Sequence, residues 1–202
     1  MMIPDLALHK GPVYGRSVRV LTGPGRAQRL RGPGNSGEVR PTSSLVKSAI
    51  FNMIPPELIE GGRVMDAYAG TGALGIEALS RGARWADFIE RDRAMCQRVR
   101  ESLEAFGFAE TSHVYCATVK KGIEFLSEPY DLVLMDPPYA ESGTDEIMAQ
   151  MANAGLLKEK SLLVLEHSSR VAPVERAGAM ALSRTRRYGD TAVSFYHLES
   201  GS

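Results

Sequence analysis

A glycine-rich loop between a short apolar strand and an apolar helix constrains the fold of this chain most. Residues 63–66 end in Asp66, and Gly70, Gly72 and Gly75 follow at the spacing G-x-G-x-x-G, where a helical apolar pattern begins. Glycines let the backbone approach a ligand closely, and the unpaired N–H groups of a helix that starts there point at the same place. The pattern predicts a nucleotide-type ligand at the carboxyl edge of a parallel sheet.

Strand and helix patterns alternate along the rest of the chain, which predicts one mostly parallel sheet with right-handed crossovers. The expected strands lie near 63–66, 85–90, 113–116, 130–136 and 161–166. The expected helices lie near 73–81, 91–106, 119–127 and 143–154, and a further one follows Thr42 or Ser43 and stops at Pro55-Pro56. Met180–Tyr188 and Ala192–Leu198 are expected to form a closing hairpin around Gly189-Asp190.

A second motif, Asp136-Pro137-Pro138-Tyr139, ends the apolar run 132–135. The prolines fix their own φ angles and donate no hydrogen bonds, so nearby carbonyl groups stay available as acceptors. A carboxylate, a free carbonyl and an aromatic ring together suit a flat base that carries an NH2 group. By itself the motif fits a proline-rich corner with a capping Asp equally well.

Two acids at strand ends indicate which nucleotide the glycine loop would hold. The glycine spacing alone also fits a dinucleotide-binding dehydrogenase. However, Asp66 would repel a pyrophosphate and attract a cationic amino group or sulfonium, which favours S-adenosylmethionine (AdoMet). Glu90 ends the next strand, 85–90, where an acid can accept both ribose hydroxyls.

These motifs, in this order and spacing, resemble the class I AdoMet-dependent methyltransferases that modify exocyclic amines. Residues 39–42 (Val-Arg-Pro-Thr) and 72–83, which include Ser-Arg-Gly-Ala, are similar to the RsmD-type methyltransferases in particular. That resemblance runs from about Val18 to Leu198. It implies a Rossmann-like, seven-stranded, mostly parallel sheet, and methylation of guanine N2 in bacterial 16S rRNA.

The motifs and the resemblance together give the expected site. The catalytic candidates are Asp136, Pro137 and Tyr139. The cofactor-binding candidates are Asp66, Ala69, Gly70, Thr71, Gly72, Glu90, Arg91, Thr118 and Asp136. Where the family usually places an Asp or Asn near the adenine, this chain has residues 115–119, Tyr-Cys-Ala-Thr-Val, so Thr118 or backbone groups are expected to take that role.

The basic N-terminal segment, residues 1–40, carries seven Lys and Arg against two acids, although the whole chain has a formal net charge of zero. Alternating Val or Leu and Arg between Gly-Pro-Gly turns predicts an RNA-contacting β-hairpin appended to a catalytic domain of residues 41–202. The expected RNA-binding residues are Arg16, Arg19, Arg26, Arg29, Arg31, Arg40 and Thr42. A flexible tail is the alternative. A second basic group, Arg184, Arg186 and Arg187, fits an ordinary solvated strand face, most of all at Arg184.

The composition fits a single cytoplasmic enzyme. With 202 residues, of which 44% are hydrophobic, the chain can bury one sizeable core. Cys96 and Cys116 are too few for a disulfide framework and are expected to be core thiols. The four His are scattered, so no metal site is expected, and no run is long and apolar enough to span a membrane. The expected partner is 16S rRNA within a small-subunit ribosomal particle, bound by a monomer.

Two other functions remain open from the sequence. An amine methyltransferase could act on adenine or cytosine of DNA, or on another RNA, because Asp-Pro-Pro-Tyr does not encode the base. A nucleotide-binding or RNA-binding module could lack catalysis, although the presence of both Asp136 and Tyr139 argues against it.

Overall fold

The computed structural model describes residues 17–19, 29–31, 44–138 and 141–199. The strands are β1 (Ser17–Arg19), β2 (Arg29–Arg31), β3 (Arg63–Ala67), β4 (Trp85–Glu90), β5 (Ser112–Cys116), β6 (Tyr130–Met135), β7 (Leu157–Ser168), β8 (Arg176–Ala177), β9 (Met180–Tyr188) and β10 (Thr191–Leu198). The helices are α1 (Ser44–Met53), α2 (Ala73–Ser80), α3 (Arg93–Phe106), α4 (Val119–Gly122) and α5 (Thr144–Asn153), with single 3₁₀ turns at Pro56–Leu58, Ala109–Thr111 and Ile123–Phe125.

The main sheet has the strand order β5-β4-β3-β6-β7-β10-β9-β8. Its first five strands are parallel, and β10, β9 and β8 are antiparallel to their neighbours. The predicted closing hairpin is confirmed as β9 and β10. The predicted strand number of seven is wrong, because β8 adds an eighth strand beside β9. With two residues, β8 is too short to show the alternating pattern from which a strand is predicted.

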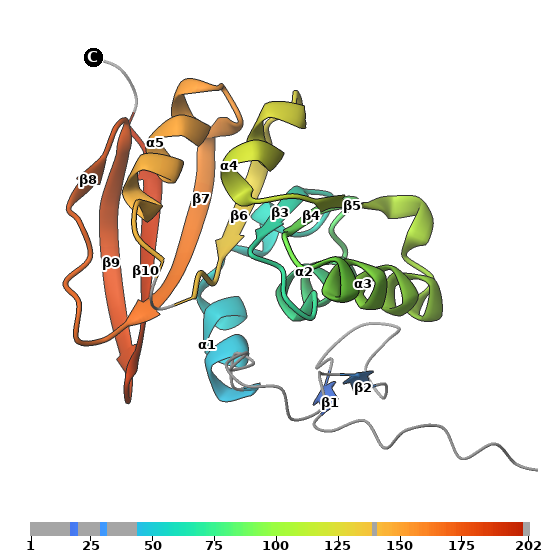
Figure 1. Ribbon diagram of the computed structural model, residues 1–202. Helices are drawn as coiled ribbons and strands as arrows, with labels where there is room; N and C mark the ends of the chain where they lie inside the picture. Colours follow the sequence, from blue (N-terminus) through green and yellow to red (C-terminus); the bar gives the residue numbers. More distant parts are fainter. Residues whose placement is uncertain (1–16, 20–28, 32–43, 139–140, 200–202) are drawn as a thin grey trace, which may run out of the picture.

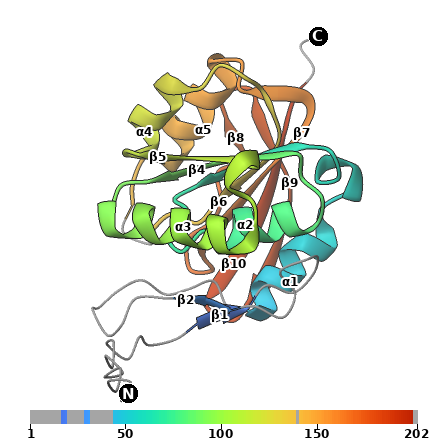
Figure 2. The ribbon, with the colours of Figure 1, turned by 90° about the vertical axis from the view of Figure 1, so that its right-hand side faces the viewer.

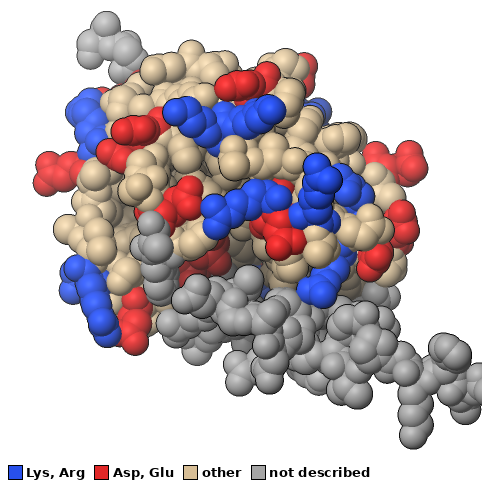
Figure 3. All heavy atoms as spheres, viewed as in Figure 1, with Lys and Arg blue, Asp and Glu red and all other residues tan. Residues whose placement is uncertain are grey.

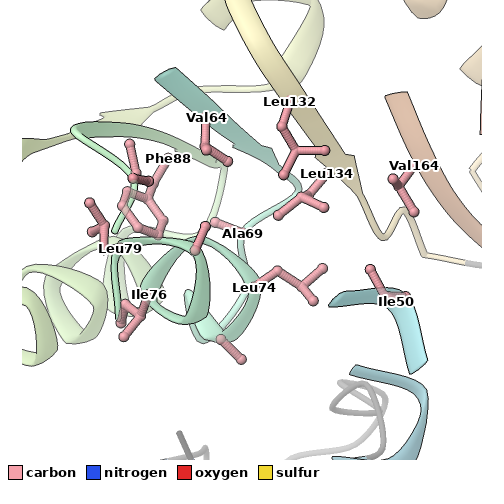
Figure 4. Close-up of a cluster of buried hydrophobic side chains, with 14 of the residues drawn as sticks. Ile50, Val64, Ala69, Leu74, Ile76, Leu79, Phe88, Leu132, Leu134 and Val164 are labelled. Carbon is pink, nitrogen blue, oxygen red and sulfur yellow. The ribbon is translucent and has the colours of Figure 1, made fainter. Parts of the chain in front are cut away.

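Two helical layers cover the sheet (Figures 1 and 2). One apolar cluster joins α1, α2 and α3 to the side chains of Val64, Phe88, Leu134 and Val164 (Figure 4). The other joins α4 and α5 to the opposite face of the same strands, through residues such as Met65. Because strand side chains alternate between faces, Asp66 and Glu90 fall on the face covered by α2 and α3.

Helix α1 is held against α2 by a buried ion pair, in addition to its apolar contacts. Lys47 Nζ lies 3.4 Å from Glu77 Oε2 of α2, and both side chains are fully buried. Glu77 also accepts a hydrogen bond from Arg81 Nε at 2.9 Å. Burial lowers the pKa of Lys47, and the carboxylate of Glu77 opposes that shift. This anchor fixes the segment that joins the N-terminal arm to the sheet.

The first two strands, β1 and β2, pair antiparallel, with Val18 opposite Leu30, as the sequence predicts. The helix predicted over 119–127 is shorter, since α4 ends at Gly122 and continues only as a 3₁₀ turn. Among the described residues, no helix is long and apolar enough to cross a membrane.

Candidate active site

The loop that follows β3 reverses the chain tightly before α2 begins. Gly70 and Gly72 have φ angles of 52° and 74°, in the left-handed region that suits glycine. Gly75 lies against β4, where an added Cβ would come within 2.3 Å of the Phe88 ring. The glycine spacing therefore serves both the turn and the close packing of α2 on the sheet.

Tyr68 is the residue of this loop that the sequence reasoning missed. It adopts a φ of 67°, which is uncommon for a residue with a bulky side chain, and such backbone strain clusters at functional sites. Its hydroxyl is buried and has no hydrogen-bond partner among the described residues. Burial, with the charge of Glu141, raises the pKa of Tyr68 to about 12. An aromatic residue inside a glycine loop is the signal that could have revealed it.

Asp66 is buried beneath the loop, and its carboxylate accepts the Gly75 N–H at 2.8 Å. Burial raises the pKa of Asp66 well above its usual range, the hydrogen bond from Gly75 opposes the shift, and the charges of Asp136 and Glu90 raise it further. The three acids are thus close enough to interact through their charges. The structure brings them together at the carboxyl edge of the sheet, as the sequence predicts.

Glu90 connects the glycine loop to the start of α3. One carboxylate oxygen accepts the Gly70 N–H at 2.8 Å, and the other accepts the Asp92 N–H at 2.7 Å. Asp92 in turn caps α3 by accepting the N–H groups of Ala94 and Met95. An ionised carboxylate offers about four lone-pair sites, so Glu90 can still accept two ligand hydroxyls.

The Asp-Pro-Pro motif follows β6 directly. Asp136 is half-buried and Pro137 is buried, while Tyr139 lies outside the described residues. Beyond the motif, Glu141 lies 3.9 Å from Arg91, which follows Glu90. Arg91 is mostly exposed, and this ion pair spans from the loop after β4 to the loop after β6. Thr118 is exposed beyond the end of β5.

The expectation of two core thiols is wrong. Cys96 is buried, but Cys116 is exposed at the end of β5, and the two form a disulfide. They are 20 residues apart in the sequence. Parallel pairing of β4 with β5 brings the end of β5 beside the start of α3, a proximity that periodicity alone does not reveal.

The predicted RNA-binding residues are described only in part. Arg19, Arg29 and Arg31 lie in β1 and β2, and their side chains are outside the described part of the chain, as are Arg16, Arg26, Arg40 and Thr42. Arg184 is not a solvated strand residue. Its guanidinium donates to the Met53 carbonyl oxygen of α1 at 2.6 Å and lies over the Phe195 ring, whereas Arg186 and Arg187 are exposed.

Among the described residues, no three His, Cys, Asp or Glu side chains are grouped so that they could hold a metal ion. A family model described as "Conserved hypothetical protein 95" matches residues 18–197. The chain belongs to this family, the RsmD-type methyltransferases.

Two named relatives support the assignment of the chain to this family. YlbH of Bacillus subtilis, named as an rRNA methyltransferase, is 32% identical over 182 residues, which cover 89% of this chain and 98% of YlbH. Ribosomal RNA small subunit methyltransferase D of Escherichia coli K12 is 28% identical over 183 residues, which cover 91% of each chain.

Solved structures agree with the fold. The Escherichia coli protein yhhF, described as a methyltransferase, superimposes with a TM-score of 0.78 at 26% identity, covering 92% of this chain and all of yhhF. SMU.776, a methyltransferase in complex with S-adenosylhomocysteine, gives a TM-score of 0.67 at 14% identity, over 84% of this chain and 53% of that one, which shows the fold alone. The class I methyltransferase fold is therefore confirmed, and AdoMet is the cofactor of the chain.

Proposed function

We propose that this protein transfers a methyl group from AdoMet to the exocyclic N2 amine of a guanine in bacterial 16S rRNA. The observation that carries the proposal is the position of Asp136 directly after β6, whose Met135 pairs in register with Ala67 just before the glycine loop. In this position Asp136 would accept hydrogen bonds from an amine held next to the glycine loop. The named relatives that match most of the chain are rRNA methyltransferases.

The chain offers a set of groups that fit AdoMet. Glu90 would accept the two ribose hydroxyls while it keeps its bonds to Gly70 and Asp92. Gly70 is open to close approach, since an added Cβ would meet only the Tyr68 carbonyl oxygen, at 3.9 Å. Ala69, Thr71 and Gly72 complete the loop, and Asp66 would hold its geometry from beneath by accepting the Gly75 N–H. Contacts of Thr118 with the adenine and of Arg91 with the cofactor remain predictions.

AdoMet supplies an electrophilic methyl group on a sulfonium. Guanine N2 is a poor nucleophile because its lone pair is delocalised into the ring, so positioning and stabilisation of the developing positive charge lower the barrier. Asp136 and the carbonyl of Pro137 would accept the two N2 hydrogens. Tyr139 would stack on the base, a contact worth about 1–3 kcal/mol, which only offsets the few kcal/mol needed to extrude a base.

The remaining binding energy must come from RNA contacts elsewhere on the chain. On the face seen in Figure 3, Lys and Arg alternate with Asp and Glu over the described surface, so no patch of one sign is evident there. The excess of basic residues is concentrated in residues 1–40. We infer that this arm is the main RNA-binding element, and that the substrate is rRNA in a small-subunit particle bound by a monomer in the cytoplasm.

A methyl-transfer assay with Asp136→Ala tests the proposal. With tritiated AdoMet and small-subunit particles from cells that lack the modification, the wild type should label 16S rRNA, and nucleoside analysis should find N2-methylguanosine. Asp136→Ala should lose at least about 100-fold in methyl transfer and keep AdoMet affinity within a few fold, as expected for a group that acts on the transition state. Near-normal turnover would exclude the role of Asp136, and label on adenine or cytosine would instead support the alternative amine methyltransferase.

A further inference from the structure

The disulfide between Cys96 and Cys116 lies next to the main chain of Glu90. Cys116 pairs in register with Glu90, and the Cys96 sulfur is 3.2 Å from the Glu90 carbonyl oxygen. That oxygen also accepts the N–H of Ala117 at 3.0 Å. The two Cα atoms are 6.0 Å apart, inside the range of roughly 4.4–6.8 Å that a disulfide requires.

This position connects the disulfide to the cofactor site through a single residue. The main chain of Glu90 contacts the disulfide region, and its side chain holds the Gly70 loop and the Asp92 cap of α3. The disulfide also fastens the end of β5, just before Ala117 and Thr118, to the first turn of α3. A change of redox state therefore alters the tie between two elements that flank the predicted cofactor site, the end of β5 and the first turn of α3.

We propose that Cys96 and Cys116 form a reversible thiol–disulfide site whose redox state sets the affinity for AdoMet. A protein that acts on rRNA works in a reducing compartment, where disulfides are rare and those that form are usually transient and redox-sensing. The exposure of Cys116 lets a small oxidant reach it. The inference requires AdoMet as cofactor but is independent of the guanine assignment.

The oxidation is balanced with glutathione disulfide as the oxidant. The Cys116 thiolate attacks one glutathione sulfur, the glutathione S–S bond breaks, and one glutathione thiolate leaves. Deprotonated Cys96 then attacks the Cys116 sulfur of the mixed disulfide and releases the second glutathione. The protein loses two electrons and two protons, and one glutathione disulfide becomes two glutathione thiols.

The oxidised form is the state with the higher affinity. In it, the end of β5 and the start of α3 are tied together around Glu90, which pre-organises the ribose acceptor. Reduction removes that tie and gives Cys96 an S–H hydrogen that can be donated to the Glu90 carbonyl oxygen, 3.2 Å away. We expect reduction to weaken AdoMet binding by about fivefold, at the low end of typical coupling between two sites.

The first experiment compares the full chain after equilibration with glutathione disulfide or with a reducing agent. Intact-protein mass spectrometry should show the loss of two hydrogens in the oxidised sample, and calorimetry should show tighter AdoMet binding in that sample. Cys116→Ser, a change at an exposed position, should bind AdoMet like the reduced wild type in both buffers. Two free thiols after oxidation, or an adduct that stops at glutathione on Cys116, would exclude the site.

Linkage supplies a second measurement that does not depend on enzyme activity. If AdoMet binds the oxidised form about fivefold more tightly, saturating AdoMet must lower the reduction potential of the disulfide by about 20 mV, since a tenfold change in equilibrium corresponds to 29.6 mV. S-adenosylhomocysteine can replace AdoMet as the probe. Equal affinities in the two redox states, with an unchanged potential, would overturn the proposal even if guanine methylation were established. Conversely, a redox effect on binding would stand if the methylated base proved to be another.

Discussion

The carboxylate of Glu90, the last residue of β4, accepts a hydrogen bond of 2.8 Å from the backbone N–H of Gly70, which lies in the loop between β3 and α2. The same carboxylate accepts the Asp92 N–H that precedes α3. Glu90 thus connects two loops at the carboxyl edge of the sheet. A pre-organised acceptor loses less entropy on binding than a mobile one, which suits the role proposed for Glu90 as the ribose acceptor.

Replacement of Glu90 by Ala should weaken AdoMet binding by about tenfold to a hundredfold, because hydrogen bonds to a charged group typically contribute about 1.5–3 kcal/mol. Calorimetry measures this loss. Glu104→Ala, at an exposed position on α3, is the matched control and should bind AdoMet normally. Unchanged affinity in Glu90→Ala would remove Glu90 from the cofactor site.

The raised pKa of Asp66 predicts how stability depends on pH. Above 3.8, the usual pKa of this side chain, the unfolded chain has released a proton that the folded protein retains. The free energy of unfolding contributed by Asp66 therefore falls as pH rises toward the pKa of the folded state. Asp66→Asn removes this titration. In urea unfolding without cofactor, the free energy of unfolding of the wild type minus that of the variant should therefore decline as pH rises from 3.8 toward the pKa of the folded state. Parallel pH profiles would contradict the raised pKa.

Replacement of Gly75 by Ala tests the close packing of α2 on β4. An added Cβ would lie 2.3 Å from the Phe88 ring, and such overpacking typically costs about 1–3 kcal/mol of stability. Chemical denaturation measures the loss. Phe88→Leu in the same chain should recover part of it, so the double variant should be more stable than the sum of the single effects predicts. Strict additivity would show that the ring is not the obstacle.

Deletion of residues 1–36 tests the basic arm. AdoMet binding should persist, since Asp66, Glu90 and Asp136 lie outside the deleted segment. Binding to rRNA should weaken, and each lost phosphate contact should flatten the plot of log affinity against log salt by about 0.7–0.9. Filter binding over a salt series measures that slope. An unchanged slope would show that the arm makes no phosphate contacts, and the exposed Arg186 and Arg187 would then be the candidates for the RNA-binding surface.

The sequence was sufficient to predict the elements that carry strong local signals. The apolar runs before Asp66 and Asp136 became β3 and β6, and the acids appeared at one edge because parallel strands joined by right-handed crossovers present their carboxyl ends together. The hairpin of β9 and β10 followed from two alternating segments around Gly189. The strands and the hairpin depend on residues close together in the sequence, and the shared edge follows from the alternation of strands and helices.

Other features depended on the tertiary structure, because they join segments that are far apart in the sequence. Arg184 is bound by α1, whose Met53 is 131 residues away. The disulfide likewise requires β5 to lie beside β4 and α3 to cover them. The strand β8 was missed for a different reason, since it pairs with the adjacent β9 but is too short to show an alternating pattern. Local periodicity reports which face of an element is apolar, but it carries no information about which distant polar or sulfur atoms that face will meet. The sequence therefore determined the glycine loop and the sheet edge at which the acidic residues meet, and only the tertiary structure decided which distant side chains lie against that loop and that edge.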